Sequence, residues 1–123
     1  MKYIDIKLGG EEVELKLGMR EVDLLERRAD KSMLELVQAL LSMKISTFVD
    51  IVIVGLQSDR RLTPQQVYKL LDKDLAANPS YLMDTIPEVG KQLAQLAGLP
   101  MDEDEDEEKA PKGKPKAVTT GKE

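Results

Sequence analysis

The hydrophobic pattern of this chain is densest between Ile45 and Leu56, which hold the longest apolar run and the single phenylalanine, Phe48. Such a run is typical either of a fully buried strand or of a helix buried on most of its surface. A strand over 49–54 would show no alternation. At 100° per residue, however, the polar residues gather on one narrow stripe: Ser46, Thr47, Asp50 and Gln57. We therefore predict a central buried helix, with Thr47 and Asp50 as a capping box at its start.

Two segments before this helix alternate between apolar and polar residues. Alternation places their apolar side chains on one face: Ile4, Ile6, Leu8, Val13, Leu15 and Leu17. Gly9 and Gly10 stand between the segments and tolerate the positive φ of a tight turn. The pattern predicts a β-hairpin over 2–17 that packs on helices or on another subunit. Because each strand has an open edge, we also expect a homo-oligomer through the hairpin.

Apolar residues at helical spacing follow, and they predict helices over about 19–29, 32–43, 46–57, 63–77 and 80–97. Ser32 with Glu35, and Thr63 with Gln66, have the spacing of capping boxes, and Pro64 suits a first helical position.

Three residues mark expected boundaries. Asp30 tolerates the left-handed conformation that ends a helix. Gly55 is either a terminator of the central helix or a point of close contact. Pro87 predicts a short turn over 80–85 and a helix that begins near the proline.

The composition fits one domain with an aliphatic core, because 41% of the 123 residues are hydrophobic and only 3% are aromatic. The net charge is −5, but eight of the 23 acidic and five of the 18 basic residues lie in 101–123, so the preceding part is nearly neutral. We expect a single α+β domain over 1–100, with the hairpin followed by a four- to five-helix bundle around the central helix. The acidic and then Lys/Pro-rich tail over 101–123 is predicted to be disordered.

The chain has neither cysteine nor histidine, which excludes disulfides, thiol nucleophiles, imidazole bases and the usual zinc ligands. The acidic run 102–108 begins like a calcium loop, but Glu107 and Gly113 occupy the positions where that loop requires Gly and Glu. The pairs Glu11/Glu12 and Asp72/Asp74 are interpreted as surface charge. We therefore predict no catalytic, cofactor-binding or metal-binding residues, and neither a signal peptide nor a membrane span.

Nucleic-acid binding is not favoured either. The lysines of 109–116 lie beside seven acidic residues and have no aromatic residue for stacking. The helix over 63–77 resembles a recognition helix only weakly, because Lys69 and Lys73 are balanced by Asp72 and Asp74.

The order of these pieces carries a family resemblance. A hairpin runs into Leu17-Gly18-Met19-Arg20, Lys31-Ser32 precedes a capping-box helix, an apolar helix ends in Val54-Gly55-Leu56, and Leu62-Thr63 opens the next helix. This arrangement resembles the small tail assembly chaperones of long-tailed bacteriophages, prophages and gene transfer agents. The resemblance covers residues 1 to about 98.

The resemblance implies a non-enzymatic protein of the bacterial host cytoplasm. Such chaperones bind the long helical tape measure protein, keep it soluble and help to recruit tail tube subunits. Many are made in two lengths through a ribosomal frameshift, for which codons 120–122 are the candidate here. The alternatives are a structural phage component, such as a head–tail connector or minor tail protein, and a small DNA-binding regulator.

A chaperone for amphipathic helices needs apolar surface that is covered only in the complex. Methionine suits such surfaces, and Met19, Met33, Met43, Met83 and Met101 are candidates for adaptable contacts. The simpler interpretation makes Met19, Met33 and Met83 ordinary core residues. The residues predicted to bind a partner, which are otherwise core, are Tyr3, Ile4 and Ile6 on the hairpin and Tyr68, Tyr81 and Met83 on the helices.

Overall fold

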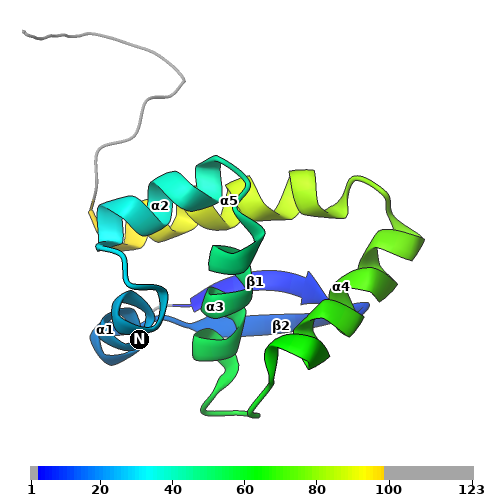
Figure 1. Ribbon diagram of the computed structural model, residues 1–123, viewed down its shortest axis with the longest axis horizontal. Coiled ribbons are helices and arrows are strands. Elements are labelled where there is room, and N and C mark those ends of the chain that lie inside the picture. Colours follow the sequence, from blue (N-terminus) through cyan, green and yellow to red (C-terminus); the bar gives the residue numbers. More distant parts are fainter. Residues whose placement is uncertain (1–2, 99–123) are drawn as a thin grey trace, which may run out of the picture.

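A computed structural model describes residues 3–98 and shows an antiparallel β-hairpin followed by five helices, which is the predicted α+β class (Figure 1). The elements are β1 Tyr3–Leu8, β2 Glu11–Lys16, α1 Met19–Ala29, α2 Met33–Leu41, α3 Ile45–Leu56, α4 Pro64–Ala77 and α5 Tyr81–Leu96. The predicted tail over 101–123 and the codon 120–122 hypothesis lie outside the described residues.

The hairpin forms as its sequence pattern predicts. Gly9 and Gly10 have φ values of 63° and 84°, which suit the two-residue turn that joins the strands. One face buries the alternating apolar side chains of Ile4, Ile6 and Leu15, and the opposite face is exposed. The hairpin therefore covers the helices with one face only.

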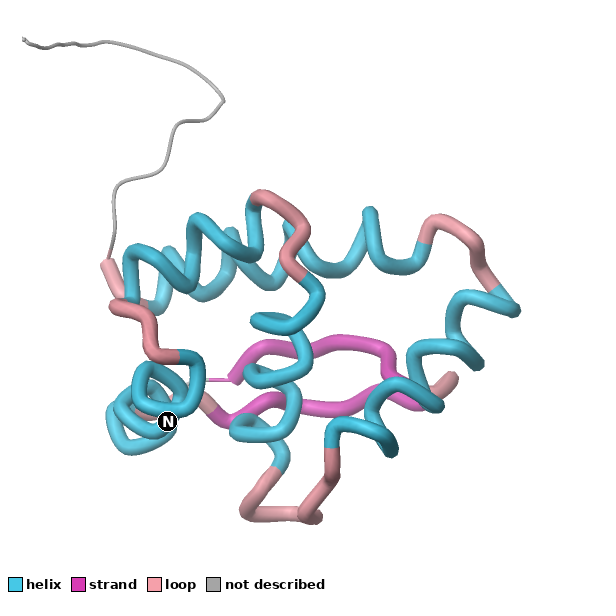
Figure 2. The backbone as a smooth tube through the Cα atoms, viewed as in Figure 1, coloured by secondary structure: helices cyan, strands magenta, loops and turns pink. Residues whose placement is uncertain are grey.

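Helix α3 lies at the centre of the fold, where it contacts β2, α1, α2 and α4 (Figure 2). Every residue from Thr47 to Leu56 is buried except Asp50, so the helical alternative holds and the strand is excluded. The predicted capping box is wrong, because the helix already begins at Ile45 with Lys44 as N-cap. Asp50 instead accepts a hydrogen bond from Arg28 of α1, at a distance of 2.8 Å.

Gly55 is a point of close contact and not a terminator, since α3 continues to Leu56. A Cβ atom at position 55 would lie 2.8 Å from Cβ and 3.2 Å from Cα of Leu15. The Cα is a backbone atom and the Cβ is fixed by it, so neither atom can rotate away. The absence of a side chain at Gly55 thus sets how closely α3 approaches the hairpin.

The predicted capping boxes of α2 and α4 are present. Ser32 and Glu35 exchange hydrogen bonds, as do Thr63 and Gln66, at 2.8–3.2 Å. Asp30 ends α1 in the left-handed conformation, with a φ of 55°.

Pro87 neither breaks nor restarts the last helix, so the predicted turn over 80–85 is wrong. Helix α5 runs without interruption from Tyr81 to Leu96. Its buried residues lie on both sides of the proline, with Ile86 before it and Val89 after it. Burial of this stripe against the rest of the core compensates for the backbone hydrogen bond that proline removes.

A buried carboxylate ties the hairpin turn to α4. Asp74 accepts hydrogen bonds from the backbone N–H groups of Gly9 at 2.7 Å and Gly10 at 2.9 Å, one at each carboxylate oxygen. The interpretation of Asp72 and Asp74 as surface charge therefore holds for Asp72 only, because Asp74 is buried.

Tyr81 makes a second attachment beside the first. Its hydroxyl, on the first residue of α5, donates a hydrogen bond to the backbone carbonyl of Lys7 in β1. Burial raises the pKa of Tyr81, and the nearby charge of Asp74 raises it further. The hydroxyl therefore remains a donor beyond the alkaline pH at which a solvent-exposed tyrosine ionises.

Replacing Gly55 by Val should lower the free energy of unfolding by about 2 kcal/mol, since overpacking a close contact typically costs about 1–3 kcal/mol. The matched control Ala76→Val adds a branched side chain at an exposed position of α4 and should cost less than about 0.7 kcal/mol. Urea-induced unfolding monitored by circular dichroism measures both. Equal effects would contradict the close approach of α3 and β2.

Asp74→Asn should destabilise the fold by about 1–3 kcal/mol, because the amide keeps one acceptor oxygen and leaves one turn N–H without a partner. Asp72→Asn makes the same chemical change on the exposed side of α4, and its effect should lie within about 0.5 kcal/mol. Hydrogen exchange of the Gly9 and Gly10 amides should become faster in Asp74→Asn, because one of the two hydrogen bonds to residue 74 is lost. Unchanged exchange in Asp74→Asn would rule out the attachment.

Candidate functional site

Half of the predicted partner-binding residues are buried, which agrees with their alternative assignment to the core. Ile4 and Ile6 are buried on the inner face of the hairpin, and Tyr81 is only 5% exposed. All three side chains stabilise the fold: the two isoleucines pack in the core, and Tyr81 donates a hydrogen bond to the carbonyl of Lys7. They are therefore unavailable to a partner in this conformation.

The other three predicted residues are exposed and lie on three different elements. Tyr3 is 48% exposed on β1, Tyr68 is 46% exposed on α4, and Met83 is 72% exposed on α5. Tyr3 lines a hollow beside β2, whereas Tyr68 and Met83 line neither of the two grooves considered below.

An apolar groove lies where the start of α1, the start of α2 and the end of α5 meet. We call it the α1–α2–α5 groove; it has a volume of about 640 Å³ and is lined by Leu17, Gly18, Met19, Val22, Asp23, Glu26, Met33, Leu96 and Ala97. Leu17 is buried at its base, and Met33 is half-buried. Met19 is 84% exposed, the largest fraction among the large exposed hydrophobic residues of 3–98.

The local chain geometry fixes Met19 at this edge. Gly18 precedes α1 in an extended conformation, and its N–H donates a hydrogen bond to Glu21 Oε1 at 3.1 Å. Glu21 is itself buried, so the junction between β2 and α1 is held from inside. Met19 is consequently the first helical residue, and its side chain stands in solvent beside the groove.

The groove combines an apolar floor with an acidic rim. Asp23 and Glu26 are the charged lining residues, and Asp23 is paired with Arg27 at 3.3 Å on the exposed surface of α1. Such a lining favours apolar side chains flanked by basic ones, which is the pattern of an amphipathic helix in a hydrophobic groove. A flexible methionine at the edge adapts to side chains of different shape.

Sequence reasoning left Met19 and Met33 between an adaptable surface and the core, did not name them as partner-binding residues, and missed the groove that they line. The lining residues lie far apart along the chain and meet only after α5 returns alongside α2 (Figure 1). Met19 has helical spacing with Val22, Leu25 and Ala29, which favours a buried position for all four. Spacing alone does not show where a helix extends beyond the neighbours that would cover it.

Within residues 3–98, no group of three or more metal-ligating side chains comes together, and none of the helices has the length and apolar character required to cross a bilayer.

Comparisons with known proteins give no independent assignment. Neither protein-family models, nor curated proteins, nor solved structures yielded a match to this chain. The groove and the element order therefore carry the functional argument.

Proposed function

We propose that this protein is a phage tail assembly chaperone, a non-enzymatic protein that binds the helical tape measure protein in the bacterial host cytoplasm. In this role it keeps the tape measure protein soluble and helps to recruit tail tube subunits before the tail is complete. The observation that carries the proposal is the α1–α2–α5 groove with Met19 exposed at its edge.

The groove supports binding of a helix for an energetic reason. Covering a methionine side chain removes apolar surface from water and contributes about 1.5–3 kcal/mol when burial is complete. Met19 gains none of this in the free protein, because it is 84% exposed. A partner helix that covers it gains binding energy without any rearrangement of the core.

The element order gives a second line of support. The hairpin, the capping-box helix after Lys31-Ser32, the apolar helix ending in Val54-Gly55-Leu56 and the helix after Leu62-Thr63 carry the resemblance to tail assembly chaperones, and all four are present as secondary structure.

Co-expression with the tape measure protein encoded downstream in the same genome tests the proposal. The partner should be soluble and co-purify with this chain, and should aggregate when expressed alone. A partner that behaves identically with and without the chain would contradict the chaperone function and favour a structural component, which purified particles would then contain.

Met19→Asp tests the groove within the same assay. The substitution adds a carboxylate to an apolar contact and should weaken binding roughly tenfold to a hundredfold, by the loss of about 1.5–3 kcal/mol. Met83→Asp is the matched control, because Met83 is also exposed and also lies in the first turn of its helix. A carboxylate in a first turn is compatible with the helix dipole, so both variants should fold. Equal loss in both would exclude the groove as the binding site.

A further inference from the structure

Of the two edges of the hairpin, that of β2 is the more open. Leu8 and Glu11 flank the two-residue turn and form a hydrogen-bonded pair, and such pairs alternate along an antiparallel ladder. Glu12, Glu14 and Lys16 therefore direct their backbone N–H and C=O groups away from β1. No other backbone group of residues 3–98 bonds to them.

The edge of β1 differs, because the fold already covers it in part. Lys7 is opposite Glu12 and points its carbonyl outward by the same alternation. Tyr81 donates its hydroxyl to that carbonyl, and both α4 and α5 contact β1. The Lys7 carbonyl is therefore unavailable for strand pairing with another chain, whereas the outward backbone groups of β2 are all free within residues 3–98.

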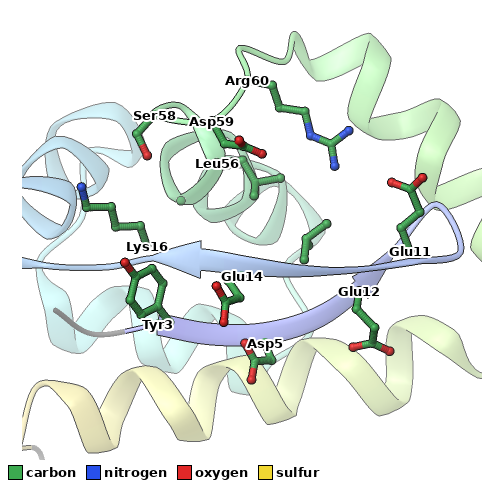
Figure 3. Close-up of a pocket in the computed structure, with 12 residues that line it drawn as sticks. Tyr3, Asp5, Glu11, Glu12, Glu14, Lys16, Leu56, Ser58, Asp59 and Arg60 are labelled. Carbon is green, nitrogen blue, oxygen red and sulfur yellow. The ribbon is translucent and has the colours of Figure 1, made fainter.

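A groove runs along the open edge of β2, and Figure 3 shows it between the strand and the segment 56–60. We call it the β2-edge groove; it has a volume of about 1010 Å³. Its lining is acidic: Asp5, Glu11, Glu12, Glu14 and Asp59 outnumber Lys16 and Arg60. None of these five carboxylates forms an ion pair within the described part of the chain.

The hairpin carries an unfavourable charge arrangement at this place. Asp5 and Glu14 are directly opposite each other on the exposed face, and like charges in a cross-strand pair repel. A cation placed over the pair would turn repulsion into attraction. The pairing of Asp5 with Glu14 destabilises the free hairpin, so it is not accounted for by a role in folding. A role in binding a basic ligand accounts for it.

We propose that the β2-edge groove binds an extended segment of another polypeptide, which adds to β2 as a third strand and carries Lys or Arg at alternate positions. Strand addition satisfies the free backbone groups of Glu12, Glu14 and Lys16. Alternation places the basic side chains beside Glu12 and Glu14, and the intervening residues against Leu56 and Gly55.

The charge argues against a second copy of this chain as the occupant. Edge-to-edge pairing of two β2 strands would bring two acidic grooves together, which opposes the homo-oligomer expected through the hairpin. The proposal concerns a surface different from the α1–α2–α5 groove, so either one can fail without the other.

A peptide titration of the full chain tests this proposal by ¹⁵N NMR. The probe is acetyl-GKVKVKG-amide, and its counterpart is acetyl-GEVEVEG-amide. The lysine peptide should slow hydrogen exchange at the amides of Glu12, Glu14 and Lys16, and the glutamate peptide should have no effect. Protection elsewhere in the chain, or equal binding of both peptides, would overturn the proposal.

Two controls separate charge from strand pairing. Glu12→Gln with Glu14→Gln should weaken lysine-peptide binding at least about tenfold, whereas Asp72→Asn with Glu88→Gln removes the same charge elsewhere and should leave it unchanged. Lysine peptides N-methylated at one or the other set of alternate amides should differ, since only one set faces β2. Equal binding of the two methylated peptides would exclude strand addition.

Two other occupants give distinct results. Dimers in sedimentation equilibrium that the Glu12→Gln, Glu14→Gln variant abolishes would assign the groove to a second copy. Binding of the lysine peptide only after Lys109, Lys112, Lys114 and Lys116 are replaced by Ser would assign it to this chain's own basic segment. Either result would overturn the proposal.

Discussion

The position of the hairpin depends on one buried carboxylate. Asp74 holds the N–H groups of Gly9 and Gly10, so that the turn of the hairpin is fixed to α4. A buried carboxylate is unfavourable unless its oxygens are hydrogen-bonded, and here the glycine turn supplies the two donors. The Tyr81 hydroxyl on Lys7 completes the attachment, and Gly55 lets α3 lie against the other strand. These contacts leave the outer face and the β2 edge to solvent.

The main elements could be predicted from the sequence because local signals agree with the tertiary structure. Alternation defined the buried face of the hairpin, and the Ser32 and Thr63 boxes marked two helix starts. The errors occurred where tertiary contacts override local preference. Pro87 sits inside a helix that packs on both sides of it, and the polar pair Thr47/Asp50 serves packing and an ion pair instead of a cap.

The candidate site was less predictable than the fold. Exposure of an apolar residue depends on which neighbours cover it, and periodicity does not report this. Tyr81 is an example, since its ring is core and its hydroxyl bonds to a strand 74 positions earlier. Met19 is the opposite case, because it lies on a helical stripe but outside the core.

The two grooves differ in the chemistry that they offer. The α1–α2–α5 groove presents apolar surface suited to a helix, and the β2-edge groove presents backbone groups and carboxylates suited to an extended basic segment. A chaperone with both surfaces could hold a long helical partner at one and a second segment at the other.

Site-specific photocrosslinking to the tape measure protein tests the central claim most directly. A photoreactive residue at position 19 should crosslink to the tape measure protein, at sites spaced three or four residues apart on one helical face. The same residue at position 83 should not. Crosslinks from position 83 alone, in a complex that still forms, would contradict the proposal that the α1–α2–α5 groove binds the tape measure protein.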